Sequence, residues 1–445
     1  MSDIMTAHYV IAAGGRLVGD VRVPGDKSIS HRAIMLGALA EGVTEVGGFL
    51  EGEDAIATMN VFRALGVHID GPDQGRVRID GVGLHGLRKP RGVLDCGNSG
   101  TSMRLLCGLL AAQSFESELT GDASLTRRPM RRVALPLREM GADIRTAGNG
   151  FPPLTIHPVN ELHGISYQLP VASAQVKSAL LLAGLYAHGL TCVIEPAPTR
   201  DHTERMLWAF AYPVQREGRS TCVRGGAGLT GTRIEVPADI SSAAFFMVGA
   251  SIAPGSDIML FDVGINPTRA GVIEILRMMG ADISLLNERK FGGEPVADIR
   301  VRHADLCGIA IPRRLVPLAI DEFPALFIAA ASASGETWLR GAGELRVKES
   351  DRIQVMADGL QALGVAAEPT ADGMRIVGAS QGNRYRGGEV ESHGDHRIAM
   401  AFSIAALAAS ETITVRDCAN VATSFPGFVE TAQHAGLRIE SYLHG

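Results

Sequence analysis

The chain has 445 residues, of which 46% are hydrophobic and 20% are charged, so it can bury a large core and is not expected to be disordered. Its formal net charge of −6 argues against nucleic acid as the main partner, because binding to phosphate backbones requires a basic surface. No stretch approaches the roughly 18 consecutive apolar residues of a membrane span, and the start MSDIMTAHYVIAAGG lacks the basic segment and cleavage site of a signal peptide. We therefore expect a cytoplasmic protein without a membrane partner.

One predicted motif recurs along the chain: an apolar helical stretch, then usually a glycine, and then a short strand. Its copies lie about 70 residues apart, a length typical of a small α/β unit. A second helix is predicted ahead of each copy, so each unit reads as strand, helix, strand, helix and closing hairpin. Six such units would form two domains of three. The copies are VFRALGVHI (61–69), PLREMGADI (136–144), MLWAFAYPV (206–214), ILRMMGADI (275–283), GLQALGVAA (359–367) and VETAQHAGLRI (429–439). The preceding helices are predicted to begin near Ser28, Asn98, Ser173, Ile240, Asp321 and Asp395.

Two similar segments mark the predicted domain boundary, VPGDKSIS (23–30) and VPADISSA (236–243). Both place Pro and Asp between a strand and a helix, where a chain can cross between lobes, although a shared strand-to-helix turn explains the likeness equally well. We therefore expect one domain at 24–235 and a second at 1–23 plus 236–445. The hinge crossovers are expected near 23–26 and 236–239.

Cations stand repeatedly at the predicted starts of helices, where the helix dipole disfavours them by roughly 0.3–1 kcal/mol each. An anion would explain the whole set, because backbone N–H groups, the dipole and a Lys or Arg would all point at it. At any single position, an arginine could equally bond loop carbonyls or neighbouring acids. The set is Lys27, Arg32, Arg104, Arg127, Arg128, Lys177, Arg200, Arg269, Lys348, Arg352 and Arg397.

Two acids lie beside these cations. Asp321 opens the helix DEFPALFIAAA, and Glu349 sits between Lys348 and Arg352 in RVKESDRI. The two carboxylates read either as structural ion pairs or as proton-transfer groups in a positive cleft. The loop DCGNSGT lacks the GK[ST] of a Walker motif, and no GxGxxG follows the first strand, which disfavours nucleoside triphosphates and NAD.

The six cysteines lie far apart, form no CxxC pair and mostly sit in apolar stretches. Buried free thiols are therefore expected, rather than a zinc site or a disulfide framework. They are Cys96, Cys107, Cys192, Cys222, Cys307 and Cys418.

Seven motifs in one order, spread from residue 25 to 426, closely resemble the 3-phosphoshikimate 1-carboxyvinyltransferases, a family of enolpyruvyl transferases. They are GDKSISHR, GNSGTSMR, GDASLTRRPM, SAQVKS, RVKESDR, GDHRIAMA and TSFP. The resemblance implies an inside-out α/β barrel of two similar domains, each of three βαβαββ units. It also implies transfer of the enolpyruvyl group of phosphoenolpyruvate to the 5-hydroxyl of shikimate 3-phosphate, with phosphate released after a tetrahedral intermediate.

The motif matches carry the family's site residues onto this chain. Asp321 is implied as the base for the 5-hydroxyl, and Glu349, helped by Lys27, as the acid for the phosphoenolpyruvate methylene. The residues implied for shikimate 3-phosphate are Lys27, Ser28, Arg32, Ser173, Ala174, Gln175, Arg200, Asp321 and Lys348. Those implied for phosphoenolpyruvate are Lys27, Gly100, Arg128, Gln175, Arg352 and Arg397. The resemblance implies no metal or organic cofactor, closure of the two domains and a monomer.

Three positions distinguish this chain within the family pattern. Many relatives carry a lysine near the (T/S)FP segment, where this chain has Ala422 and Thr423, so that contact to the donor is in doubt. Ala174 replaces a serine of some relatives and offers only its backbone. Gly100 stands where glyphosate-insensitive relatives carry alanine, so we expect glyphosate to inhibit this protein.

Two alternatives remain at this stage. UDP-N-acetylglucosamine enolpyruvyl transferase has the same fold and donor, but it carries a reactive cysteine in the loop over the site, whereas TGDASLTRRPM here has none. A non-catalytic anion-binding protein of the same fold is disfavoured because Lys27, Asp321 and Glu349 are all present.

Overall fold

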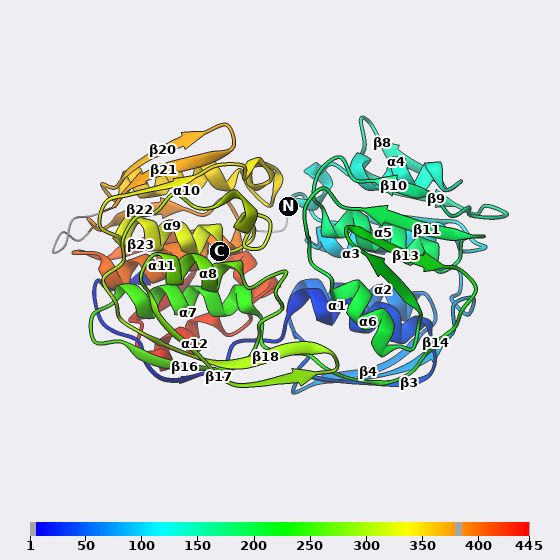
Figure 1. Ribbon diagram of the computed structural model, residues 1–445, viewed down its shortest axis with the longest axis horizontal. Helices are drawn as coiled ribbons and strands as arrows, with labels where there is room; N and C mark the ends of the chain where they lie inside the picture. Colours follow the sequence, from blue (N-terminus) through cyan, green and yellow to red (C-terminus); the bar gives the residue numbers. More distant parts are fainter. Residues whose placement is uncertain (1–5, 379–384, 445) are drawn as a thin grey trace. The chain divides into compact units, whose positions relative to one another are not determined.

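A computed structural model describes residues 6–378 and 385–444. The protein has a mixed α/β fold, as predicted, and its chain divides into two compact units (Figure 1). Unit 1 is drawn from Met1–Pro24, Pro237–Arg289 and Pro295–Gly445, and unit 2 from Gly25–Val236 and Lys290–Glu294. Each unit has a hydrophobic core of its own. Within the described residues, no helix is both long and apolar enough to cross a membrane.

Unit 2 contains three mixed sheets with one common pattern. In each sheet a central strand has a parallel neighbour on one side and an antiparallel hairpin on the other. The first sheet is β14 (Leu229–Thr230) and β15 (Arg233–Glu235), β3 (Ala40–Gly47), β5 (Arg76–Val82) and β4 (His68–Asp73). The second is β6 (Leu94–Asp95), β7 (Ser117–Thr120), β9 (Phe151–His157) and β8 (Asp143–Ala147). The third is β10 (Ser166–Gln168), β11 (Leu190–Ile194), β13 (Ser220–Arg224) and β12 (Val214–Glu217).

Unit 1 has two mixed sheets, in each of which one strand has a parallel neighbour on one side and an antiparallel neighbour on the other, and a third sheet that is antiparallel. The first is β2 (Val18–Val21), β16 (Asp257–Gly264), β18 (Glu294–Arg302) and β17 (Asp282–Phe291). The second is β22 (Gly388–Glu391), β23 (Ile413–Arg416), β1 (Thr6–Ile11) and β24 (Ile439–His444). The third is β19 (Glu336–Leu339), β21 (Gly373–Val377) and β20 (Ala366–Thr370), with β21 in the middle.

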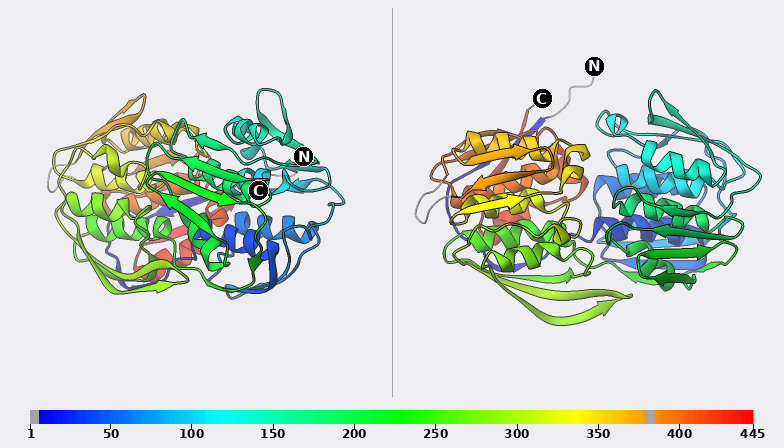
Figure 2. Two further views of the ribbon diagram at one scale, coloured as in Figure 1. Left: turned by 45° about the vertical axis from the view of Figure 1, so that its right-hand side comes forward. Right: turned by 45° about the horizontal axis from the view of Figure 1, so that its top comes forward.

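Three helices of each unit are buried along almost their whole length. They begin within two residues of the predicted starts, at α1 (Lys27–Leu39), α3 (Gly100–Leu110) and α5 (Ala174–Gly184) in unit 2, and at α7 (Ile240–Ile252), α9 (Phe323–Ser332) and α11 (His396–Ala405) in unit 1. In unit 1 these helices run between the sheet of β19–β21 and the sheet of β16–β18 (Figures 1 and 2). The more peripheral helices are α2 (Glu53–Ala64), α4 (Arg131–Glu139), α6 (His202–Ala209), α8 (Gly271–Met278), α10 (Arg352–Ala362) and α12 (Phe428–Ala435).

Close helix packing explains why the inner helices are rich in small residues. A Cβ atom at Gly108 in α3 would lie 2.1 Å from the carbonyl oxygen of Ala179 in α5, so the two backbones approach too closely for any side chain there. Polar groups buried in helices packed in this way need a partner, because a buried polar group without one is costly. The backbone N–H groups that the inner helices leave for other partners lie at their N-termini.

Polar caps open five of these six helices. The side chain of the residue before the helix accepts a backbone N–H, which satisfies one of the unpaired donors of the first turn. The acceptors are Asp26, Ser99, Ser173, Asp239 and Asp395. These caps are local sequence signals, and they explain why the helix starts could be predicted.

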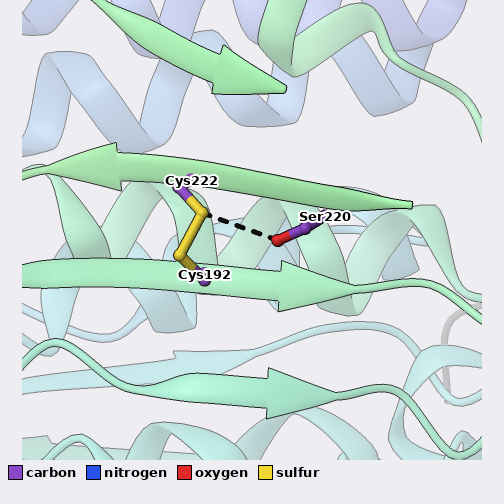
Figure 3. Close-up of a disulfide and its surroundings, with 3 residues drawn as sticks. All are labelled: Cys192, Ser220 and Cys222. Atoms are coloured by element: carbon purple, nitrogen blue, oxygen red, sulfur yellow. Dashed lines mark hydrogen bonds between the residues drawn. A yellow bond between two sulfur atoms is a disulfide. The ribbon is translucent and has the colours of Figure 1, made fainter. Parts of the chain in front are cut away.

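The prediction for the cysteines was wrong at one pair. Cys192 and Cys222 stand directly opposite each other on β11 and β13 and form a disulfide (Figure 3). The hydroxyl of Ser220 lies beside Cys222, 3.6 Å from its sulfur. The other four cysteines are free, and Cys307 is exposed rather than buried. The pair is 30 residues apart in the chain, and only the register of the two strands brings the sulfurs together.

Candidate active site

The start of α1 carries the first group of predicted ligands. Asp26 caps the helix by accepting the N–H of Ile29 at 2.9 Å, and Lys27 and Ser28 form its first turn. The ammonium group of Lys27 is paired with the buried carboxylate of Asp54 in α2. The sequence offered no signal for Asp54, because an acid in the first turn of a helix is ordinary.

Arg32 lies one turn further along α1 and is held from several sides. Its Nε donates to Thr203 Oγ1 at 2.7 Å, its Nη2 to Ser178 Oγ at 2.8 Å, and its Nη1 to the carbonyl of Ser28 at 2.9 Å. Burial lowers the pKa of Arg32 to about 10, although Glu204 opposes this shift, and the nearby charge of Arg200 lowers the pKa further. The guanidinium remains charged at neutral pH, and its hydrogen bonds fix its orientation.

The starts of α3 and α5 meet through side chains. Arg104 Nη1 donates to Gln175 Oε1 at 2.8 Å, and Gln175 Nε2 donates to Thr101 Oγ1 at 2.9 Å. Gly100, the first residue of α3, lies against two guanidinium groups, because a Cβ built on it would be 2.8 Å from Arg104 Nη1 and 3.4 Å from Arg128 Nη1. The predicted donor residues Gly100, Arg128 and Gln175 are therefore neighbours within unit 2.

Arg128 is oriented by the loops on either side of it. Its Nη2 donates to Asn98 Oδ1 at 2.7 Å and to Ser124 Oγ at 3.0 Å, and Asn98 in turn donates to Asp122 Oδ2 at 2.6 Å. The side chain is 7% exposed. These contacts hold a buried cation next to the first turn of α3.

Lys177, one of the cations at the predicted helix starts, pairs with internal acids, which is the alternative left open for any single position. Its ammonium group is completely buried and pairs with Glu195 Oε2 at 3.1 Å and with Glu204 Oε1 at 2.7 Å. Ser173 caps α5 by accepting the N–H of Val176 at 3.4 Å, and Ala174 follows it as the first helical residue. The cation in this helix therefore compensates internal acids that lie far away in the sequence.

Arg269 in unit 1, another cation of that set, also pairs with acids. It is 3% exposed, and its Nη2 lies 3.2 Å from Asp239 Oδ1, 3.6 Å from Glu322 Oε1 and 2.5 Å from Ser241 Oγ. These contacts tie the starts of α7 and α9 together. Its role in the described structure is to join two helices.

The second group of predicted ligands gathers around Arg352, the first residue of α10. Its Nη2 contacts Glu349 Oε2 at 2.7 Å, and its Nη1 lies 3.5 Å from Asp321 Oδ1. Lys348 Nζ lies 3.2 Å from the same oxygen of Asp321. The two carboxylates predicted to move protons therefore share one buried guanidinium.

Asp395 completes this group and was not predicted as a site residue. Its carboxylate is 2.7 Å from Arg352 Nε and also caps α11 by accepting the N–H of Arg397 at 3.0 Å. Burial alone would lower the pKa of Arg352, but Asp395, Glu349 and Asp321 together raise it. The sequence GDHR predicted a helix start here, but it did not indicate that the capping residue, Asp395, also pairs with Arg352 of another helix in unit 1.

Arg397 and the TSFP segment lie at the same end of unit 1. Arg397 Nη1 donates to the carbonyl oxygen of Asp321 at 3.2 Å. The short helix η5 (Ala419–Thr423), which contains Ala422, is tied to the loop before α11 because Asn420 donates to the carbonyl of Gly394 at 2.8 Å. The segment that carries a lysine in many relatives is therefore held close to the start of α11.

Comparison with known proteins shows what the chain as a whole is similar to. The family model described as EPSP synthase (3-phosphoshikimate 1-carboxyvinyltransferase) matches residues 11–432. A protein of Alkalilimnicola ehrlichii named 3-phosphoshikimate 1-carboxyvinyltransferase is 70% identical, with 97% of this chain and 96% of that protein covered. One of Methylococcus capsulatus with the same name is 68% identical, over 97% of this chain and 98% of that protein. The solved EPSP synthase of Acinetobacter baumannii matches with a TM-score of 0.88 at 59% identity, covering 98% of this chain and all of that one.

Proposed function

Because this chain belongs to the EPSP synthase family and is a transferase of the shikimate pathway, we propose that it transfers the enolpyruvyl group of phosphoenolpyruvate to the 5-hydroxyl of shikimate 3-phosphate. Inorganic phosphate is the second product. The observation that carries this proposal is the pairing of Asp321 and Glu349 with one buried arginine, Arg352. Two proton-transfer groups beside fixed cations suit a reaction between two anionic substrates.

The reaction proceeds by addition and then elimination. Glu349 donates a proton to the methylene carbon of phosphoenolpyruvate, which leaves positive character on the adjacent carbon. The charge of Lys27 assists this protonation, the 5-hydroxyl of the acceptor attacks that carbon, and Asp321 accepts the hydroxyl proton. In the elimination step Glu349 takes back a proton from the new methyl group, the carbon–carbon double bond re-forms, and the carbon–oxygen bond to phosphate breaks. Every step uses side chains that can exchange protons.

The acceptor, shikimate 3-phosphate, is bound by hydroxyl groups, backbone amides and cations. Arg32 supports this assignment because three hydrogen bonds pre-orient its guanidinium, so little conformational entropy is lost when an anion binds. The N-termini of α1 and α5 contribute unpaired N–H groups and a favourable dipole. The proposed ligands are Lys27, Ser28, Arg32, Ser173, Ala174, Gln175, Arg200, Asp321 and Lys348.

The donor, phosphoenolpyruvate, is bound by arginines that the protein holds rigidly. The guanidinium of Arg352 is fixed by Asp395 and that of Arg128 by Asn98 and Ser124, while Arg397 Nη1 donates to the carbonyl oxygen of Asp321. Preorganised cations of this kind stabilise charge that moves toward the leaving phosphate. The proposed ligands are Lys27, Gly100, Arg128, Gln175, Arg352 and Arg397.

The remaining expectations from the family belong to the same proposal. We propose that each unit is an inside-out α/β barrel of three βαβαββ units, that the boundaries near 23–26 and 236–239 act as hinges, and that the protein is a cytoplasmic monomer. Three sheets and three buried helices in each unit support the threefold repeat.

Phosphate release in the presence of each acceptor tests the proposed reaction. The purified protein is incubated with phosphoenolpyruvate and either shikimate 3-phosphate or UDP-N-acetylglucosamine, and inorganic phosphate is measured. We expect release with shikimate 3-phosphate only. Release with the nucleotide sugar alone would overturn the assignment.

A further inference from the structure

His31, which directly precedes Arg32 in α1, is buried at the junction of three helices and takes no part in the proposed chemistry. It is 0% exposed. Its Nδ1 lies 2.7 Å from Thr58 Oγ1 in α2 and 3.2 Å from Ser102 Oγ in α3, and its Nε2 lies 3.4 Å from Ser99 Oγ, the cap of α3. The imidazole therefore connects α1 with the residues on both sides of Gly100.

The hydrogen bonds around His31 are all satisfied by one neutral tautomer. Thr58 donates its hydroxyl proton to the carbonyl of Asp54 at 3.2 Å, so its oxygen accepts from His31 Nδ1–H. Ser99 Oγ already accepts the N–H of Ser102 at 3.1 Å, which leaves its own proton to donate to His31 Nε2. Ser102 Oγ can donate to Thr58 Oγ1, with which it is also in contact.

The surroundings of His31 favour this neutral form. Burial lowers the pKa of His31 well below its usual value, and the nearby charges of Lys27 and Arg32 lower it further. Asp54, the charged group facing this cluster from α2, is paired with Lys27. A neutral imidazole can accept from Ser99 and donate to Thr58 at the same time, whereas an imidazolium can only donate.

We propose that His31 is a positioning residue for the donor half of the reaction: it fixes the Ser99–Ser102 turn, and thus Gly100, relative to Lys27. This role rests on the proposed function, in which Gly100 and Lys27 both bind phosphoenolpyruvate. Arg32 is held separately by Thr203 and Ser178, so binding of the acceptor does not depend on the His31 contacts.

Two isosteric substitutions separate the contacts of the imidazole. The amide nitrogen of His31→Asn can occupy the place of Nδ1 and keep the contacts to Thr58 and Ser102, whereas His31→Gln reaches the place of Nε2 and loses both contacts. We expect His31→Gln to raise the KM for phosphoenolpyruvate about fivefold, the effect of losing roughly one hydrogen bond, and to change the KM for shikimate 3-phosphate by less than about twofold. His31→Asn should restore most of the donor KM.

Ser30→Ala is the matched control. Ser30 is the preceding residue of α1, is equally buried, and accepts the N–H of Leu50, a residue outside α3, at 3.0 Å. The Ser30→Ala substitution should leave the KM for phosphoenolpyruvate unchanged. Equal rises of both KM values in His31→Gln, or a similar donor effect in Ser30→Ala, would show a general loss of structure and overturn the positioning role.

Amide hydrogen exchange gives a readout that is independent of catalysis. His31→Gln should speed exchange at Ser102, whose N–H is bonded to Ser99 Oγ, while the middle of α1 stays protected. Unchanged exchange at Ser102 overturns the inference even if the reaction proceeds.

If the wild-type protein releases no phosphate with shikimate 3-phosphate, the proposed function fails, and the exchange result still decides whether His31 holds the turn. Should His31→Gln fail to fold, Ser102→Ala, which removes a contact to His31 and Thr58, must raise the donor KM selectively, and an unchanged value would refute the role.

Discussion

The carboxylate of Asp395 accepts two hydrogen bonds from the guanidinium of Arg352, from Nε to Oδ2 at 2.7 Å and from Nη2 to Oδ1 at 3.2 Å. Neither side chain is more than 1% exposed. The same carboxylate caps α11 by accepting the backbone N–H of Arg397, so one buried acid holds the guanidinium of Arg352 and the start of the helix that carries Arg397.

Removing the charge of Asp395 should therefore be costly for stability and for donor binding. Asp395→Asn leaves Arg352 buried with a weaker partner, and we expect the free energy of unfolding to fall by about 3 kcal/mol. Denaturant unfolding measures this change. Asp351→Asn, at the more exposed cap of α10, is the control and should cost less than about 1 kcal/mol, since asparagine caps a helix as well as aspartate does. Equal losses in the two variants would contradict the special role of Asp395.

Glu349→Gln should lower turnover by about 10²-fold or more, because an amide cannot deliver the proton that the addition step requires. Binding should remain largely intact, since the amide oxygen can still accept from Arg352 Nη2. Steady-state kinetics with both substrates check the effect, and Glu411→Gln, at an exposed position of unit 1, is the control. Unchanged turnover would remove Glu349 from the mechanism.

Gly100→Ala should reduce inhibition by glyphosate and raise the KM for phosphoenolpyruvate. The added Cβ would lie 2.8 Å from Arg104 Nη1 and 3.4 Å from Arg128 Nη1, so the guanidinium groups around the donor position must move. Inhibition is measured at low phosphoenolpyruvate. Gly92→Ala is the matched control, because a Cβ there meets nothing within 4 Å. Inhibition of the wild-type protein only at millimolar glyphosate would count against the expected sensitivity.

The Cys192–Cys222 disulfide predicts four titratable thiols among the six cysteines of the denatured, non-reduced protein. Closing a loop between residues 30 apart contributes roughly 3–4 kcal/mol in the chain-entropy description. A reductant should therefore lower the Tm of the wild-type protein but not that of Cys192→Ser. Cys307→Ser, which removes an exposed free thiol, should leave the response to reductant unchanged. Six reactive thiols without reductant would show that the bridge does not form.

Stability should fall in mildly acidic solution because of His31. Its pKa in the folded protein is well below the unfolded value of about 6.5, so below that pH the unfolded chain binds a proton that the folded protein does not. The free energy of unfolding should therefore decrease as pH falls through about 6.5, by up to ~1.4 kcal/mol per pH unit until the folded pKa is reached. Urea unfolding between neutral and acidic pH should show a smaller slope for His31→Asn than for the wild type. Equal slopes would mean that other groups cause the dependence.

Much of the candidate site could be predicted from the sequence because its signals are local. Lys27, Gly100, Arg352 and Arg397 stand in the first turns of helices whose caps can be read directly from neighbouring residues. The mixed α/β class followed from the alternation of helical and strand patterns for the same reason.

Residues that hold the ligands in place could not be predicted. Asp54 reaches Lys27 from α2, Thr203 reaches Arg32 from α6, and Asp395 reaches Arg352 from α11. Each of these contacts joins positions far apart in the chain, and each residue type is also ordinary for its own helix start.

The sequence by itself determined where the buried helices begin and that most of them open with a polar cap followed by a cation, because capping and helix dipoles depend on neighbouring residues. Only the tertiary structure decided what each cation pairs with. Lys177 and Arg269 look like ligands in the sequence, yet buried carboxylates of distant segments neutralise them. A charge in a protein interior requires a partner, and the fold alone determines which partner comes within reach.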